Sequence, residues 1–223
     1  CLGGFCETDL KTLLRSRVAK LRKGERLFVA GDACRELFAV HAGAFKSLLV
    51  DREGREVVCG FRLAGDMLGL EAIADGRHAC DAVALEDSEV CVLPRAQLDA
   101  GAAREPSVQR ELTRVLAMEL RDRQAMGAVL ATMGAEARLG AFLADLSRRY
   151  GERGFDGARL RLPMSRTDIA AYLALTPETV SRAFTRLEGE GAIRVSARSV
   201  VIDDFARLHS RAEEKLTQVS NCP

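Results

Sequence analysis

Two helix-start signals stand close together near the C-terminus and leave room between them for only a short helix and a tight turn. Ser165 and Asp168 form the Ser-x-x-Asp pattern of a capping box, and Thr176-Pro177-Glu178 follows a few residues later. A hydroxyl oxygen accepts from the free N–H groups of a first turn, proline suits the first helical position, and an acid favours the positive end of the helix dipole. With a turn at Ala174-Leu175, this spacing predicts a helix-turn-helix.

The second predicted helix, Pro177 to about Glu188, has one apolar and one polar face. Val180, Phe184 and Leu187 share the apolar face. A helix of this kind can enter the major groove of double-stranded DNA, where arginine donates to guanine and glutamate accepts from cytosine. We therefore expect DNA contacts from the side chains of Ser165, Arg166, Thr176, Glu178, Thr179, Ser181, Arg182 and Arg186.

A short β-hairpin, or wing, is predicted after this helix from Ala192–Val195 and Ser199–Ile202, with Arg194 and Arg198 available to phosphates. The segment from Arg148 to Arg198 has ten arginines, no lysine and six acidic residues, a net charge of +4, so the remainder of this +1 chain is −3. A locally basic region favours a DNA-binding unit attached to another domain. The alternative is a helical hairpin whose charges only face solvent.

Residues 18–93 consist of short apolar runs separated by glycine-containing turns, which is typical of a compact antiparallel barrel or roll. A short helix over Thr8–Arg15 precedes this region, and a short strand over Leu160–Leu162 is expected much later in the chain. The predicted strands of the roll are Arg26–Val29, Leu37–Val40, Phe45–Val50, Glu56–Phe61, Ala82–Leu85 and Val90–Leu93.

A long helix is expected to begin near Pro106, followed by a further helix over Ala135–Tyr150. Apolar residues at Val108, Leu112 and Val115 form one stripe that can pack on the roll. A second stripe favours a second copy of the chain as partner, although a single wide core-facing stripe is the alternative. The predicted dimerisation stripe consists of Thr113, Leu116, Leu120, Arg123, Gly127 and Leu130.

An enzyme is not expected, because the histidines are scattered and no Ser–His–Asp, Cys–His, HExxH or phosphate-loop arrangement is evident. The cysteine spacing is irregular and contains no CxxC pair, which argues against a zinc ribbon. No apolar run approaches the roughly 20 residues that span a bilayer, and no signal peptide is visible. These features predict a cytoplasmic protein without a membrane partner.

The order of roll, long helix, helix-turn-helix and wing resembles the CRP/FNR superfamily of bacterial regulators over nearly the whole chain, and it looks closest to the oxygen-sensing FNR branch. The matching segments are Leu27–Asp32, Gly60–Asp66, Leu146–Arg149 and Leu175–Arg182. In that branch a Glu-x-x-Ser-Arg sequence on the recognition helix reads the operator, and Glu178, Ser181 and Arg182 match it. The resemblance implies a homodimer on a palindromic operator and contact with RNA polymerase, and leaves activation or repression open.

The resemblance also implies an α+β architecture divided into four parts. Residues 1–100 would form a cyclic-nucleotide-binding-like antiparallel β-roll that acts as the sensor, and residues 101–134 the dimerisation helix. Residues 135–208 would form the winged helix-turn-helix, and residues 209–223 a C-terminal tail.

The oxygen-sensing branch holds a [4Fe–4S] cluster on three N-terminal cysteines and one cysteine of the roll. By resemblance, Cys91 matches the roll cysteine and Cys1 the last N-terminal one. Cys6 does not match the family spacing, and the other two ligands would lie upstream of Cys1, so this chain offers at most two matched ligands. The alternative for Cys91 is a buried small hydrophobic residue. Structural roles are expected for Cys34, Cys59 and Cys80, and Cys222 is a tail residue.

Cyclic nucleotide is not expected as the effector. The family's nucleotide site uses a Gly-Glu pair and a later Arg-Ser pair, whereas this chain has Gly65-Asp66 and Ala79-Cys80 at or near these places. Two hypotheses for regulation therefore stay open. The chain either responds to oxygen or redox state through an iron–sulfur cluster, or it is the same DNA-binding regulator with a different small-molecule effector or none.

Overall fold

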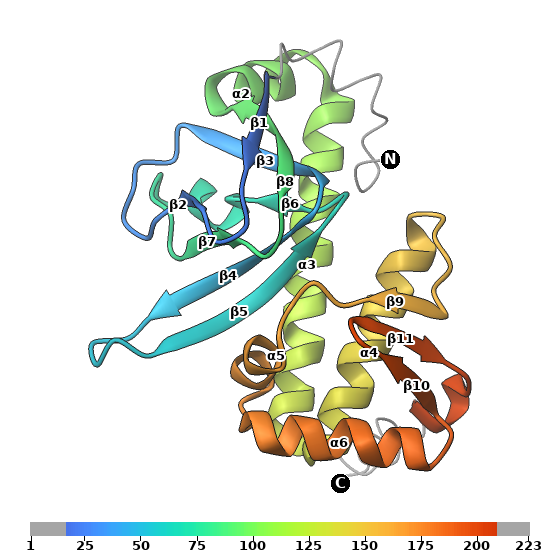
Figure 1. Cartoon of the computed structure of the whole chain (residues 1–223). Coiled ribbons are helices and arrows are strands. Elements are labelled where there is room, and N and C mark those ends of the chain that lie inside the picture. Colours follow the sequence, from blue (N-terminus) through green and yellow to red (C-terminus); the bar gives the residue numbers. More distant parts are fainter. Residues whose placement is uncertain (1–16, 209–223) are drawn as a thin grey trace, which may run out of the picture. The chain divides into compact units, whose positions relative to one another are not determined.

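The computed structural model describes residues 17–208. The predicted helix Thr8–Arg15 and the residues Cys1, Cys6 and Cys222 lie outside these residues, as does the predicted tail. The chain divides into two compact units, Cys1–Glu119 and Leu120–Pro223. Figure 1 labels the elements of both units.

Unit 1 contains two four-stranded antiparallel sheets. All six runs predicted from the sequence overlap strands, whereas β1 and the short β6 were not predicted. The first sheet has the order β1 (Arg17–Leu21), β8 (Ser88–Pro94), β3 (Glu36–Ala42) and β6 (Met67–Leu68), and the second has β2 (Arg26–Phe28), β7 (Asp81–Ala84), β4 (Ala44–Val50) and β5 (Glu56–Leu63).

The strands β3 and β8 of the first sheet are largely buried on both faces, which explains their nearly continuous apolar sequences, whereas β1 at the edge is mostly exposed. Side chains alternate along each strand, so neighbouring residues enter different core clusters. On β8, Val90 and Val92 pack in a cluster with Phe28 and Phe45 of the second sheet. Cys91 and Leu93 point to the opposite face of β8 and belong to a different cluster, which also contains Leu98 and Leu112 of the following helices.

The turn between β3 and β4 requires glycine. Gly43 has φ of 85°, a left-handed conformation that side chains rarely adopt. An added Cβ would also lie 2.1 Å from Oγ of Ser88. Glycine therefore lets the chain reverse tightly against β8, as the repeated glycine turns of the sequence predict.

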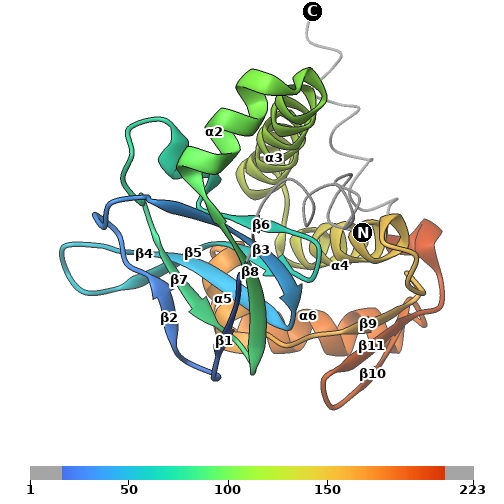
Figure 2. The ribbon, with the colours of Figure 1, turned by 90° about the horizontal axis from the view of Figure 1, so that it is seen from above.

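Two helices follow the sheets of unit 1, and the second of them continues into unit 2. They are α2 (Arg95–Arg104), which was not predicted, and α3 (Pro106–Thr132). Figures 1 and 2 show α2 beside the beginning of α3. A 3₁₀ turn, η1 (Leu70–Ile73), joins the same core. The predicted boundary at residue 100 falls inside α2.

The apolar stripe predicted to pack on the roll is confirmed. Leu112 is buried in the core cluster that contains Cys91, and Val108, Val115 and Leu116 pack against this cluster. Leu116 was assigned to the dimerisation stripe, so it also contributes to the core of its own unit.

Unit 2 is a winged helix-turn-helix. It contains α4 (Ala135–Glu152), β9 (Arg159–Arg161), α5 (Arg166–Leu173), α6 (Pro177–Gly189), β10 (Ile193–Ser196) and β11 (Ser199–Ile202). The strands form an antiparallel sheet in the order β10-β11-β9. In Figure 1, α6 crosses the lower end of the unit and the β10–β11 hairpin follows it.

The core of unit 2 joins α4 to the two shorter helices. Leu139 and Leu143 of α4, Ile169 of α5 and Val180 of α6 are fully buried. Phe142 of α4 contacts Tyr172 of α5 with ring centroids 5.7 Å apart. Val180 belongs to the apolar face predicted for the second helix, and this apolar seam fixes the two short helices on α4. None of the helices within residues 17–208 is long and apolar enough to cross a membrane.

Candidate DNA-binding site

The first helix of the motif starts at the predicted capping box. The Ser165 hydroxyl accepts a hydrogen bond from the backbone N–H of Asp168 at 3.0 Å, and a carboxylate oxygen of Asp168 accepts from the backbone N–H of Ser165 at 2.9 Å. The same hydroxyl donates to Asp168 at 2.6 Å. Ser165 thus holds the start of α5, and any contact that it makes with DNA would add to this role.

The turn between α5 and α6 is short and tightly bonded. Ala174 ends α5 in the left-handed region, with φ of 52° and ψ of 49°. Thr176 then caps α6 by accepting from the backbone N–H of Thr179 at 3.2 Å, and Pro177 occupies the first turn. Both predicted caps and the predicted turn are therefore confirmed.

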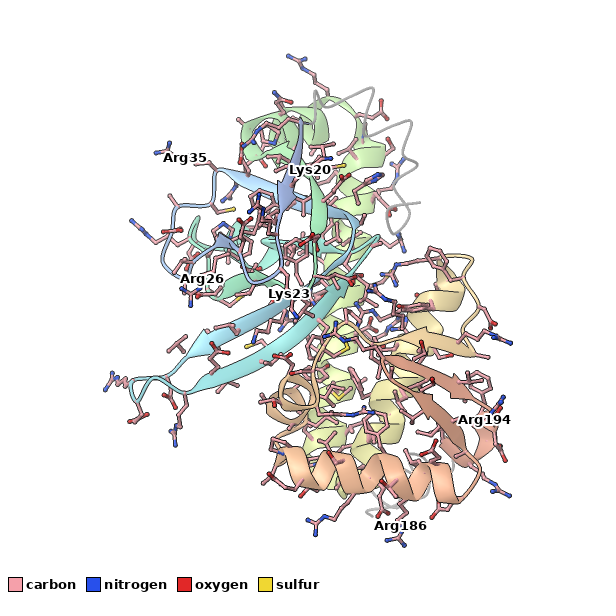
Figure 3. All side chains as sticks on the ribbon, in the orientation of Figure 1. Lys20, Lys23, Arg26, Arg35, Arg186 and Arg194 are labelled. Carbon is pink, nitrogen blue, oxygen red and sulfur yellow. The ribbon has the colours of Figure 1, made fainter. Side chains whose placement is uncertain are left out.

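The helix α6 presents two different faces. Val180, Phe184 and Leu187 are buried as predicted, and Ala183 joins them. On the opposite face Glu178, Ser181, Arg182, Thr185 and Arg186 are exposed, while Thr179 is half-buried. Figure 3 shows Arg186 projecting from α6 away from the unit. The buried face fixes the helix, and the exposed face offers donors and acceptors to a ligand.

Hydrogen bonds order the side chains at the start of α6. The Thr179 hydroxyl lies 3.0 Å from the Thr176 hydroxyl and accepts from Nη2 of Arg182 at 3.3 Å. The Ser181 hydroxyl donates to the carbonyl of Pro177 at 2.9 Å. The guanidinium of Arg182 is thereby linked through Thr179 to the helix cap.

Glu178 lies at the positive end of the α6 dipole. Its own backbone N–H lowers the pKa of the Glu178 carboxyl, and the Thr176 hydroxyl and the charge of Arg182 lower it further. The carboxylate is therefore ionised at neutral pH and can only accept hydrogen bonds. This property suits the amino group of a cytosine in the major groove.

Two of the arginines expected to contact DNA already contact other side chains of unit 2. The guanidinium carbon of Arg166 lies 3.2 Å from the centroid of the Phe184 ring, and burial lowers the Arg166 pKa. Arg186 pairs with Glu136 of α4 at 2.9 Å and with Glu190 at 3.5 Å. Arg166 therefore holds α5 against α6, whereas Arg186 links α6 to α4 through an exposed ion pair.

The wing has the predicted hairpin, but one of its arginines is paired. Arg194 forms a two-bond ion pair with Asp203, with distances of 2.8 and 2.9 Å. This pairing departs from the expectation that Arg194 is open to phosphates, because Asp203 lies beyond β11, outside the segment whose charge was considered. Arg198 is exposed at the hairpin turn.

The roll cysteine expected to bind a cluster is buried. Cys91 pairs with Val18 of β1 and Ala39 of β3 and is 5% exposed. Within residues 17–208 there is no group of three His, Cys, Asp or Glu side chains that could hold a metal ion. The described residues therefore contribute at most a part of an iron–sulfur site, and Cys1 lies outside them.

The other described cysteines occupy the roll. Cys34 and Cys80 are buried, and Cys59 is partly buried. Burial, with a smaller contribution from the charge of Glu71, raises the pKa of the Cys80 thiol to about 11. Asp66, considered for a nucleotide site, accepts instead from the backbone N–H of Leu63 at 2.7 Å and closes its own turn.

Sequence reasoning missed Glu136 and Arg138 of α4. Glu136 pairs with Arg186, and Arg138 donates to the carbonyl of Met133 before α4 and to that of Leu173 at the end of α5. Neither residue belongs to a local pattern, because Arg186 and Leu173 lie in other helices and Met133 in the link before α4. A charged residue in the first turn of a helix is too common to indicate such a role.

Comparison with known proteins agrees with this geometry. Residues 18–105 match the cyclic nucleotide-binding domain, and residues 137–211 match the Crp-like helix-turn-helix domain. The chain is 38% identical over 206 residues to the fumarate and nitrate reduction regulatory protein of Salmonella typhimurium, covering 92% of this chain and 82% of that protein. The protein of the same name from Escherichia coli K12 is 38% identical over 198 residues, covering 89% and 79%.

Solved structures show the same fold over the same extent. FixK2 from Bradyrhizobium japonicum superposes with a TM-score of 0.80 at 32% identity, covering 88% of this chain and 96% of that one. A CRP/FNR family regulator from Thermus thermophilus, TTHA1359, has a TM-score of 0.67 at 22% identity, covering 89% and 100%, which supports the fold alone. These relatives are regulators of transcription and not enzymes, and the chain belongs with them to the CRP/FNR family of DNA-binding transcription regulators, of the FNR type.

Proposed function

We propose that two copies of this regulator bind a palindromic operator in double-stranded DNA, each inserting α6 into the major groove. The observation that carries the proposal is the single exposed face with Glu178, Ser181 and Arg182 on a helix whose other face is buried. The two recognition helices would enter grooves about one DNA turn apart, roughly 34 Å. RNA polymerase would be the second partner, in the cytoplasm.

Each exposed side chain has a proposed part in reading DNA. Arg182 would donate two hydrogen bonds to a guanine, and the ionised Glu178 would accept from a cytosine amino group. Ser181 already donates to the Pro177 carbonyl, so its oxygen would act as an acceptor. Ser165, Thr176 and Thr179 lie at the starts of α5 and α6 and Arg186 is exposed on α6, so these residues would set the register on the DNA backbone, whereas Arg166 would act mainly by holding α5 on α6.

Dimerisation would use the second stripe of α3. Leu120 supports this proposal because 59% of this large apolar side chain is exposed in the single chain. Thr113, Arg123 and Gly127 are exposed as well, and Leu116 and Leu130 are half-buried. A second copy of the helix would cover Leu120 and remove its apolar surface from water.

The base-reading role can be tested by binding-site selection followed by affinity measurement. Arg182→Ala should weaken binding to the selected operator by about 1–3 kcal/mol and relax the preference at one base position. Arg159→Ala serves as a control, because Arg159 is an exposed arginine of unit 2 that pairs with Asp156. Equal affinity of the Arg182→Ala variant and the parent for the operator would refute the role.

We further propose that the regulator responds to oxygen or redox state through an iron–sulfur cluster in which Cys1 and Cys91 take part. The position of Cys91 supports this proposal, because its face of β8 shares a core cluster with Leu112 of α3. A cluster would supply redox chemistry at thiolate ligands. A change in redox state at Cys91 would therefore alter the packing of the core against α3, the helix that carries the proposed dimer stripe.

The redox proposal is tested by an anaerobic absorption spectrum with iron and sulfide analysis, on protein made from its complete reading frame. Iron, sulfide and a charge-transfer band that is lost in air are expected for the parent and for Cys34→Ser, and not for Cys91→Ser. Cys34 is the matched control because it is a buried cysteine in the same hydrophobic core as Cys91. A colourless protein that still binds its operator would favour a different effector or none.

A further inference from the structure

The guanidinium of Arg138 binds the C-terminal ends of two other helices. Arg138 lies in the first turn of α4, and its Nε donates to the carbonyl of Met133 at 2.8 Å, directly after the end of α3. Its Nη1 donates to the carbonyls of Leu173 at 2.9 Å and Ala174 at 3.4 Å, which end α5. Three helices of unit 2 therefore meet at one side chain.

This arrangement suits arginine in particular. Carbonyls at the C-terminal end of a helix lack partners within the helix and carry the negative end of its dipole. A guanidinium is always charged at physiological pH and offers several donors in one rigid plane, so it can satisfy two helix ends at once. A lysine ammonium at the same place is a point charge on a flexible stem and would hold the two ends less firmly.

The connection that Arg138 spans is short, and the apolar side chains of Val129 and Met133 are buried beside it. Only Met133 and Gly134 separate α3 from α4, and a Cβ added at Gly134 would meet nothing within 4 Å. Further along the same two helices, Arg148 of α4 binds Asp122 of α3 at 3.0 Å. The Arg148–Asp122 ion pair acts at a distance from the corner, whereas the hydrogen bonds of Arg138 act at the corner itself.

We propose that Arg138 is a positioning residue that sets the helix-turn-helix against the end of α3 and so fixes the spacing between the two recognition helices of a dimer. The inference rests on the proposed binding of a palindromic operator by a dimer. Residues Leu120, Arg123, Gly127 and Leu130 of the proposed dimer stripe lie on the same part of α3, within unit 2. A change of angle at the corner therefore displaces α6 relative to the partner's α6, although Arg138 need touch no DNA.

The test compares the parent with Arg138→Gln on three kinds of duplex: the selected palindrome, a single half-site, and palindromes with one base pair inserted or removed at the centre. The palindrome should be bound about tenfold more weakly by the variant, equivalent to about 1.4 kcal/mol. Half-site affinity should change by less than about twofold. The variant should prefer the natural spacing less strongly than the parent does, because a looser corner between α3 and α4 tolerates other spacings.

Arg159→Gln is the matched control, since it removes one positive charge from unit 2 at a residue that pairs with Asp156. It should weaken all duplexes by a similar small factor and leave the spacing preference intact. Circular dichroism shows whether Arg138→Gln is folded. If Arg138→Gln is unfolded, Arg138→Lys is used in its place, and it too should prefer the natural spacing less strongly than the parent does.

Two results separate the possible failures. If a folded Arg138 variant weakens half-site and palindrome by the same factor and keeps the parental spacing preference, the positioning role is overturned. If the parent itself gains nothing from a palindrome over a half-site, the proposed dimeric binding fails before any variant is compared.

Discussion

Replacing Ala174 with glycine should stabilise unit 2. Ala174 is exposed and has φ of 52° and ψ of 49° at the turn between α5 and α6. An L-residue in this left-handed conformation costs about 1–2 kcal/mol, which glycine avoids. The greater freedom of glycine in the unfolded chain offsets about 0.5–1 kcal/mol of that gain. Because the methyl group is exposed, almost no burial is lost, and the free energy of unfolding should rise by about 0.5–1 kcal/mol.

The chain offers a selective optical signal for this measurement. It has no tryptophan, and its two tyrosines, Tyr150 and Tyr172, both lie in unit 2. Tyrosine fluorescence during guanidinium denaturation therefore reports this unit. Ala171→Gly is the matched control, because Ala171 lies inside α5, where the same substitution should lower the free energy of unfolding by about 1 kcal/mol.

The two variants should thus move the denaturation midpoint in opposite directions, although they lie three positions apart in the sequence. An unchanged or lower midpoint for Ala174→Gly would refute the assignment of backbone strain to this turn. Operator affinity should stay at the parental value, since the Ala174 carbonyl that Arg138 binds is a backbone atom and survives the substitution.

Three further predictions concern single side chains. Thr179→Val should reduce discrimination at the base that Arg182 contacts, because it removes the hydroxyl that accepts from Nη2 of Arg182, whereas Thr179→Ser should retain discrimination; equal base preferences in selection experiments would contradict this role. The native Cys80 thiol should react with iodoacetamide more slowly than Cys59 at neutral pH, because burial raises the Cys80 pKa to about 11, as mass spectrometry can show. The raised pKa means that the folded state holds this proton more tightly, so its contribution to stability is complete below about pH 9 and is lost as the pH rises through about 11. Cys80→Ala should flatten that part of the stability profile.

The helix-turn-helix could be predicted in detail because its signals are local. The caps at Ser165 and Thr176 involve residues within three positions, and the apolar face of α6 repeats with the period of one helix. The strands of the roll were located for a similar reason, since glycine turns separate them. Their pairing into two sheets, with β8 beside both β1 and β3, depends on residues far apart in the chain.

The features that escaped prediction depend on tertiary contacts. The stacking of Arg166 on Phe184, the pair of Arg194 with Asp203 and the bonds of Arg138 join separate elements. Composition and periodicity show that a surface is basic, but they do not show which arginines already have partners within the protein. Burial of Cys91 depends on its partners in β1 and β3, which the local sequence does not reveal.

These contacts separate the basic residues of unit 2 by how readily they can turn to DNA. The side chains of Arg186 and Arg194 are 62% and 72% exposed in their ion pairs. Exposed pairs of this kind contribute about 0–1 kcal/mol, so a phosphate can replace the carboxylate at small cost. Arg166 differs because its guanidinium is partly buried over Phe184, and turning to DNA would sacrifice that stacking. Arg186 and Arg194 should therefore each contribute about one unit to the salt dependence of operator binding, whereas Arg166 should act mainly by holding α5 on α6.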